Sequence, residues 1–261
     1  MVPSPTSTTA SLLYIVEPEG SVGAYQYVNA DPITGERERN FEREEKSVII
    51  ENIRGKENSV SLDTAGFQFY HRYPSKHTTF ANDEEIRREY YPESAELIKK
   101  VTGASRVELF DHSELLCPLH FDLFFKKKIT ILSLLAIRRR RPGEADVSAD
   151  RRQPVSQVHV DQTTASAIAR VHRHLPALDV PKLLERRFQI INLWRPIATP
   201  AIDWPLALCD YRSVDLNREV IPVKLIFPDR EGETLGVKYN ENHKWKYLEG
   251  MTPEEFVLIK W

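Results

Sequence analysis

Cysteine, long apolar runs and strong net charge are all scarce in this sequence, and each scarcity removes a class of protein. The only two cysteines among 261 residues, Cys117 and Cys209, exclude a disulfide framework and a cysteine-based zinc module. We therefore expect a reducing, cytoplasmic setting. The longest apolar run, Ile129–Ile137, is far shorter than the roughly 20 residues that span a bilayer as a helix, so we expect no membrane partner.

The net charge and the absence of several motifs argue against further classes of protein. A formal net charge of -2 gives no field that would attract nucleic acid, so we expect no nucleic-acid partner. We find no glycine-rich dinucleotide or phosphate loop and no G-x-S-x-G turn, which disfavours NAD-dependent enzymes and serine hydrolases. The first residues, "MVPSPTSTTASLLYIV", do not have the pattern of a signal peptide.

Short segments rich in β-branched and aromatic residues are what the sequence does contain. Strands are predicted at "SLLYIV", "RFQIINLWRPI", "VIPVKLIF" and "ETLGVKYN". Helices are predicted at "NDEEIRREYYPESAELIKKVTG", split by Pro92 and ended by Gly103, and at "TASAIARVHRHL". We therefore predict a β-rich α+β protein with a double-stranded β-helix (jelly-roll) core and flanking helices, forming a single domain over residues 1–261.

One segment, Ser113–Ala136, does not match its surroundings because it is rich in Leu and Phe and contains a KKK run. Three interpretations stay open. The segment is a buried strand or helix pair, a basic targeting or nucleic-acid patch, or a retained in-frame intron whose removal would join "FDH" to "IRRRRPG".

The stretch "QVHVDQTT" contains an H-x-D pattern, His159 and Asp161. Side chains at i and i+2 of a strand point to the same face, so an imidazole and a carboxylate would project together. With a second histidine they would form a 2-His-1-carboxylate site for Fe(II), with positions left open for a 2-oxo acid and O₂. The alternative is a hydrogen-bonded pair at the surface or core edge. A second H-x-D, His120–Asp122, lies in the atypical segment and is interpreted as a coincidence.

Other polar residues are weaker candidates. Arg195 and Asn192 in "IINLWRPI" could contact a substrate or co-substrate, although a structural ion pair is the alternative for Arg195. His243 in "YNENHKWKY" is interpreted as a solvated turn histidine, and Cys209 as a small buried apolar residue without a nucleophilic role. No catalytic acid, base or nucleophile is assigned. The histidines that offer no convincing third ligand are His71, His77, His112, His172 and His174.

Four longer stretches carry a resemblance: "RQPVSQVHVDQT", "RFQIINLWRPI", "PLALCDYRSV" and "GVKYNENHKWKYLEGMTPEEFVLIK". In this order, and over Ser11 to Lys260, they resemble the fungal AsaB-type hydroxylase/desaturase family, which includes a gibberellin desaturase and CmcJ relatives. The resemblance implies an oxidoreductase that hydroxylates or desaturates a small natural product in fungal secondary metabolism. It also implies Fe(II) and 2-oxoglutarate as cofactors, with His159 and Asp161 as metal ligands.

The sequence departs from this family in two places. The segment Ser113–Ala136 interrupts a normally continuous region, and the chain stops at Trp261, whereas the family continues with "PHTAF" and later an arginine. The resemblance places the distal metal histidine, and an arginine for 2-oxoglutarate, in that further segment. We therefore expect an incomplete core, and the alternative function is a non-catalytic accessory subunit or a truncated pseudoenzyme. A homo- or hetero-oligomer is compatible with either function.

Overall fold

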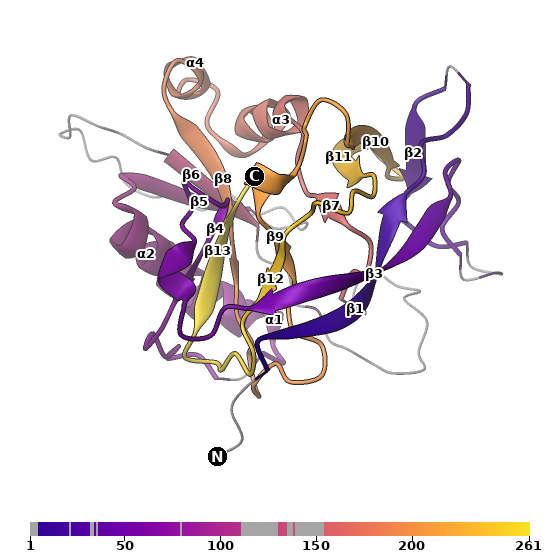
Figure 1. Cartoon of the computed structure of the whole chain (residues 1–261). Coiled ribbons are helices and arrows are strands. Elements are labelled where there is room, and N and C mark those ends of the chain that lie inside the picture. Colours follow the sequence, from indigo (N-terminus) through magenta and orange to yellow (C-terminus); the bar gives the residue numbers. More distant parts are fainter. Residues whose placement is uncertain are drawn as a thin grey trace. The chain divides into compact units, whose positions relative to one another are not determined.

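The computed structural model describes residues 5–20, 22–31, 34, 36–78, 80–110, 130–134, 138 and 154–261 (Figure 1). The chain divides into two compact units. Unit 1 comprises residues 1–53, 137–167 and 207–247. Unit 2 comprises residues 54–136, 168–206 and 248–261. Each unit is therefore assembled from three separate stretches of the chain.

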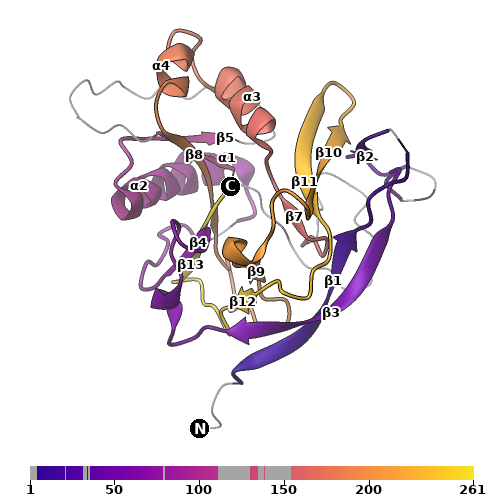
Figure 2. The same cartoon turned by 45° about the horizontal axis from the view of Figure 1, so that its top comes forward.

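The first sheet of unit 1 is built on a long antiparallel pair. Its strands, in spatial order, are β1 (Ser7–Ile15), β3 (Arg43–Asn52), β12 (Trp245–Tyr247) and β9 (Leu208–Cys209). β1 and β3 pair along the whole length of β1, and Figure 2 shows them running side by side. β12 joins β3 in parallel, so the sheet is mixed.

The second sheet of unit 1 carries the H-x-D stretch at one edge. Its strands, in spatial order, are β2 (Ala24–Tyr27), β10 (Val220–Ile226), β11 (Glu231–Val237) and β7 (His159–Val160). β7 pairs antiparallel with β11, with Gly236 opposite His159 and Leu235 opposite Val160. On its other side, the chain just before β7 bridges to β1, where Val158 N donates to Leu13 O (2.8 Å). The H-x-D stretch is thus held from two sides.

Both faces of β1 are buried at its end. Tyr14 joins one apolar cluster and Ile15 joins another, because successive side chains of a strand point to opposite faces. The indole of Trp245 donates a hydrogen bond to the Tyr14 hydroxyl (2.9 Å), which satisfies two polar groups inside the first cluster. Burial raises the pKa of Tyr14 to about 12, so this hydroxyl stays protonated.

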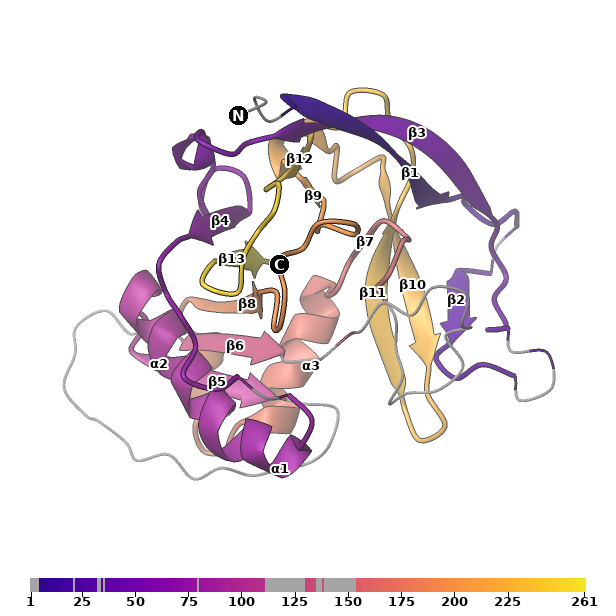
Figure 3. The same ribbon diagram turned by 90° about the horizontal axis from the view of Figure 1, so that it is seen from below.

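Unit 2 is built on a five-stranded sheet, seen from below in Figure 3. Its strands, in spatial order, are β4 (Phe67–Tyr70), β13 (Phe256–Lys260), β8 (Phe188–Trp194), β6 (Thr130–Leu134) and β5 (Arg106–Phe110). The β4, β13 and β8 pairs are antiparallel, whereas β6 is parallel to both of its neighbours. Helix α2 (Tyr91–Thr102) covers one face through Ala95 and Ile98, which join the apolar cluster of that face.

The helical stretch before β5 is continuous in the structure. α1 (Asp83–Glu85), the π-helix η2 (Ile86–Tyr90) and α2 follow one another directly, so the expected split at Pro92 is wrong. Pro92 lies in the first turn of α2, directly after the π-helix η2. Gly103 ends α2 in the left-handed region (φ 69°), as predicted. In the described part of the chain, the remaining helices are η1 (Glu57–Ser59), α3 (Thr164–His174), α4 (Val180–Leu184) and η4 (Tyr211–Ser213).

The prediction of a β-rich protein with few helices is confirmed, and its sheets are mixed. Within the atypical segment, residues 130–134 form the buried strand β6, in which Ile131 and Leu132 are fully buried. Residues 113–129 and 135–136 of that segment lie outside the described residues. Among the residues that are described, no helix combines the length and apolar character needed to cross a membrane.

Candidate metal site

The imidazole of His159 and the carboxylate of Asp161 lie close together, although Asp161 follows the end of β7. His159 Nε2 is 3.1 Å from Asp161 Oδ1. The two side chains are 32% and 26% exposed, so they are neither sealed in the core nor extended into solvent. A ligand or ion could therefore reach both groups.

A hydrogen bond to the backbone fixes the His159 tautomer. Nδ1 donates to the Gln157 carbonyl oxygen (2.7 Å), so in the neutral ring Nε2 carries the lone pair. That lone pair then faces a carboxylate oxygen, which also only accepts. Two acceptors at this distance need a proton or a metal ion between them. Burial lowers the pKa of His159, but the adjacent Asp161 carboxylate and the Gln157 carbonyl outweigh it and raise the pKa overall.

The separation also suits a metal ion. Two ligand atoms each about 2.1 Å from an ion, at a right angle, lie about 3.0 Å apart. The 3.1 Å between Nε2 and Oδ1 matches this, and an Nδ1–H held by a carbonyl is the usual support of a metal-bound histidine. The pair therefore fits Fe(II). Among the described residues, no group of three His, Cys, Asp or Glu side chains could hold a metal.

The neighbouring strand shapes the backbone of the pair. Gly236 lies opposite His159, and a Cβ placed on it would come within 2.8 Å of the Ile15 side chain. Real Cβ atoms do not approach so closely, and Ile15 is only 1% exposed, so it has little space to retreat. The absence of a side chain on Gly236 therefore allows β11 to pack against Ile15 while it pairs with His159.

The chain after β7 is held by side-chain hydrogen bonds. Thr234 Oγ1 donates to the Val160 carbonyl (2.5 Å), and Thr163 Oγ1 donates to Glu233 Oε1 (2.5 Å). Thr163 Oγ1 also accepts from Ser166 N (3.0 Å), which makes it the N-cap of α3. Asp161 lies between these attachments.

Arg195 and Asn192 are in unit 2 and do not share a face of β8. Asn192 belongs to the half-buried face, whereas Ile191 and Leu193 alternate with it and enter the apolar cluster under α2. Arg195 follows the strand, with its guanidinium 5.5 Å from the centre of the Phe256 ring in the same cluster. The two residues therefore have different surroundings, and their expected contact with a substrate or co-substrate stays a prediction.

Arg195 is 8% exposed, and its Nη2 donates to the Tyr73 carbonyl (3.2 Å). Its Nε is buried and has no hydrogen-bond partner among the described residues, within which Arg195 forms no ion pair. In the described part of the chain, Arg195 is therefore held by a hydrogen bond to a backbone carbonyl. The alternative interpretation of Arg195, a structural ion pair, does not apply there.

His243 is not a solvated turn residue, and that prediction is wrong. Its side chain is 1% exposed, its Nε2 lies 2.9 Å from Glu219 Oε2, and its ring stacks on Tyr14 at 5.9 Å. The turn itself is polar, but the ring points back into the core of unit 1. Sequence polarity indicated the backbone environment and missed the direction of the side chain.

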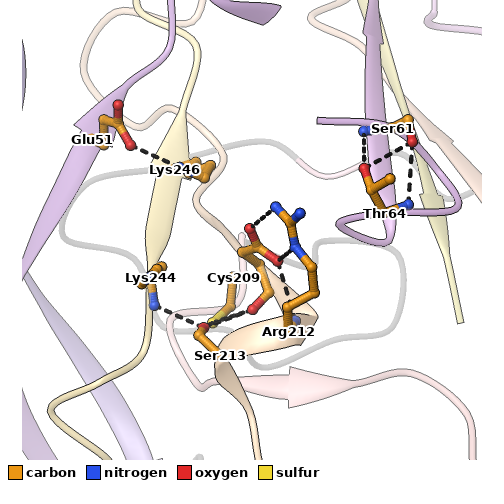
Figure 4. Close-up of polar contacts among 9 residues, drawn as sticks. Glu51, Ser61, Thr64, Cys209, Arg212, Ser213, Lys244 and Lys246 are labelled. Atoms are coloured by element: carbon orange, nitrogen blue, oxygen red, sulfur yellow. Dashed lines mark hydrogen bonds and ion pairs between the residues drawn. The ribbon is translucent and has the colours of Figure 1, made fainter. Parts of the chain in front are cut away.

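The other candidates have structural partners. His71 Nδ1 lies 2.6 Å from Glu255 Oε1, and His77 Nδ1 lies 3.1 Å from Glu89 Oε2. Cys209 is half-buried beside the Ser213 hydroxyl (3.6 Å), and burial raises the pKa of its thiol to about 11 (Figure 4). A thiol protonated at neutral pH is a poor nucleophile, which agrees with the sequence-based interpretation. His112, Cys117 and the His120–Asp122 pair lie outside the described residues.

Sequence reasoning missed the residues that support the H-x-D stretch. Thr163 carried a signal, because a threonine directly before a predicted helix is a typical N-cap. Glu233, Thr234 and Gly236 carried none, since they lie about 70 residues away and only the β7–β11 pairing brings them close.

Comparisons with known proteins give this arrangement a context. A family profile described as "Oxidoreductase/YMDC permease-like domain" matches residues 12–115 and 125–261. Hydroxylase/desaturase CTB9 of Cercospora beticola is 34% identical over 227 residues, 83% of this chain and 65% of that protein. The Fe(II)/2-oxoglutarate-dependent dioxygenase nvfI of Aspergillus novofumigatus is 27% identical over 266 residues, 100% of this chain and 85% of that protein.

A solved structure of the iron and alpha-ketoglutarate-dependent endoperoxidase NvfI superposes with a TM-score of 0.73 at 25% identity. The superposition covers 98% of this chain and 84% of that structure. The similarity therefore extends over nearly all of this chain, whereas the chain spans only about two thirds of the Cercospora beticola relative.

Proposed function

The chain belongs to the oxidoreductase family of this profile, whose matched relatives include fungal hydroxylase/desaturases and Fe(II)/2-oxoglutarate-dependent dioxygenases, and from this premise we propose that it is an oxidoreductase that hydroxylates or desaturates a small natural product. Fe(II) and 2-oxoglutarate are its proposed cofactors, with His159 and Asp161 as two of the metal ligands. The observation that carries the proposal is the 3.1 Å separation of His159 Nε2 and Asp161 Oδ1.

The residues of the chain would act by holding and orienting. His159 offers the Nε2 lone pair because Gln157 O fixes the proton on Nδ1, and Asp161 offers a negative oxygen beside it. This donor set suits Fe(II) and leaves room for further ligands. When bound, Fe(II) with 2-oxoglutarate supplies the activation of O₂ that lets a C–H bond be oxidised. Partial burial of the pair limits water at the reacting centre.

Arg195 and Asn192 are proposed as contacts of the substrate or co-substrate. Support for Arg195 comes from its buried guanidinium, whose Nε has no partner among the described residues. A guanidinium fork matches a carboxylate, and 2-oxoglutarate carries two. Asn192 has only its position on the half-buried face of β8 in its favour.

The finer assignments are also part of the proposal. The AsaB-type subtype, the jelly-roll core and a cytoplasmic location follow from the sequence resemblance and composition. A single domain over residues 1–261 is supported by the way both units draw on three interleaved stretches, since neither unit is a continuous segment of chain. A natural-product substrate is supported by the activities in the names of the relatives.

Anaerobic titration with Fe(II), with and without 2-oxoglutarate, tests the proposal. We expect binding and a coloured complex that needs both components, and we expect His159→Ala to lose both. His172→Ala is the matched control, because His172 is exposed on α3 and its loss should leave binding unchanged. Wild-type binding and colour in His159→Ala would contradict the assignment.

A non-catalytic accessory subunit or pseudoenzyme of the same family is the second candidate. It is favoured by one observation, that the described residues contain no group of three metal-binding side chains. The same titration separates the two candidates. Micromolar Fe(II) binding with 2-oxoglutarate-dependent colour supports the enzyme, and no binding by the unaltered chain supports the non-catalytic member.

A further inference from the structure

Asp161 lies outside regular secondary structure. β7 ends at Val160 and α3 begins at Thr164, so Asp161 belongs to a three-residue connection. Backbone hydrogen bonds of the sheet therefore do not fix its carboxylate relative to His159. Rotation about a few backbone bonds would carry Oδ1 away from Nε2, so something else must hold this connection.

Two consecutive residues of β11 hold the connection at its two ends. Thr234 Oγ1 donates to the carbonyl of Val160, directly before Asp161. Glu233 Oε1 accepts from Thr163 Oγ1, two residues after it. Only Asp161 and Gln162 lie between the attached residues, and the Gln162 side chain accepts from Ser166 Oγ (2.9 Å). The connection therefore has little freedom left.

The Glu233 carboxylate binds Thr163 and not the lysine that lies opposite it in the sheet. Lys224 lies directly opposite Glu233 in the β10–β11 register, yet its ammonium pairs with Glu231 (3.1 Å) near the end of the strand. Thr163 is the hydrogen-bond partner of Glu233 among the described residues. Because Thr163 also caps α3, one hydroxyl ties the start of the helix to the strand beside His159.

We infer that Glu233 is a positioning residue for the metal site. Through Thr163 it fixes the connection that carries Asp161, and so holds Oδ1 at the distance from His159 Nε2 that a shared ion requires. The inference rests on the proposed function for its purpose, but the geometric effect exists with or without a metal. Groups that orient metal ligands from behind typically contribute about 10–100-fold in metal affinity.

Four variants and one control test it in the full 261-residue chain. Glu233→Leu and Thr163→Val remove the contact, whereas Glu233→Gln and Thr163→Ser keep an acceptor and a hydroxyl. Glu231→Gln is the control, since Glu231 is a mostly exposed carboxylate on the same strand. Two measurements apply: the crystal structure of each metal-free variant, and the Kd for Co(II) followed by its absorption bands.

We expect the first two variants to move Oδ1 out of hydrogen-bonding range of Nε2 and to raise the Kd about 10–100-fold. The conservative variants should stay within about threefold of the unaltered chain, and the control should not change. An unmoved Asp161 carboxylate in both Glu233→Leu and Thr163→Val overturns the inference, as does an unchanged Kd with only a lower Tm. If the unaltered chain binds no Co(II), the proposed metal function fails, and the metal-free structures still decide the role of Glu233.

Discussion

Replacing Glu255 by glutamine should weaken unit 2 in a pH-dependent way. Glu255 Oε1 and Oε2 accept from Arg54 Nη1 (2.5 Å) and Nη2 (3.2 Å), and Oε2 also accepts from Thr252 N (2.9 Å). His71 Nδ1 lies 2.6 Å from Oε1. Burial alone would raise the pKa of this carboxyl, but the Arg54 hydrogen bonds and the other donors outweigh it and lower the pKa from 4.5 to about 2.

The pKa difference sets the size of the effect. The difference between the ordinary pKa of 4.5 and the folded pKa of about 2 corresponds to about 3 kcal/mol of unfolding free energy. Because the folded pKa is the lower one, this contribution is complete above about pH 4.5 and disappears as the pH falls towards 2. The side chain is only 10% exposed, so solvent screening removes little of it. Glu255→Gln cannot ionise and should lose the contribution at neutral pH.

Chemical unfolding at a series of pH values, followed by tryptophan fluorescence, measures the effect. At pH 7 we expect Glu255→Gln to be less stable by about 3 kcal/mol, or roughly 6–12 °C in Tm for a chain of this size. The difference from the unaltered protein should shrink steadily below pH 4.5. Glu254→Gln, at the exposed neighbouring position, is the control and should change little. A difference that is the same at pH 3 and pH 7 would refute the reasoning.

Two further predictions concern unit 1. Gly236→Ala should lower the unfolding free energy by about 1–3 kcal/mol, because the added Cβ would press on Ile15. It should also weaken Fe(II) binding by displacing the His159 backbone. Unchanged stability in a thermal melt would contradict this prediction. Cys209, with a thiol pKa of about 11, should react with iodoacetamide at pH 7.5 far more slowly than free cysteine, as mass spectrometry of the Cys209 peptide would show, and equal rates would contradict the burial argument.

Local sequence patterns predicted those helices and strands whose formation depends only on neighbouring residues. The β-branched and aromatic run of β8, the alternation along β10 and the glycine that ends α2 each act within a few residues. Pro92 was misread because proline is tolerated in a first helical turn, and the sequence did not reveal that a new α-helical turn begins there.

Only the central pair of the candidate site, His159 and Asp161, was predictable from the sequence. The period of two in extended chain predicted that the side chains of His159 and Asp161 would lie close together, although Asp161 follows the end of β7. Their tautomer, their separation and their support depend on Gln157, Glu233 and the rest of β11, which pairing across the sheet selects. His243 shows the opposite failure, since its polar neighbours suggested solvent, whereas Glu219 and Tyr14 enclose its ring from distant parts of the chain.

The position of β13 has a consequence for synthesis of the protein. This strand, residues 256–260, lies in the sheet between β8 and β4, and β4 is made nearly 190 residues earlier. At 5–20 residues per second, a ribosome needs roughly 10–40 s to cover that interval. Throughout it, β4, whose Phe67 and Phe69 are buried in the finished protein, lacks the strand that pairs with it in the described part of the chain. Unpaired strand edges promote aggregation, so the β4 edge stays open to self-association until β13 has been made.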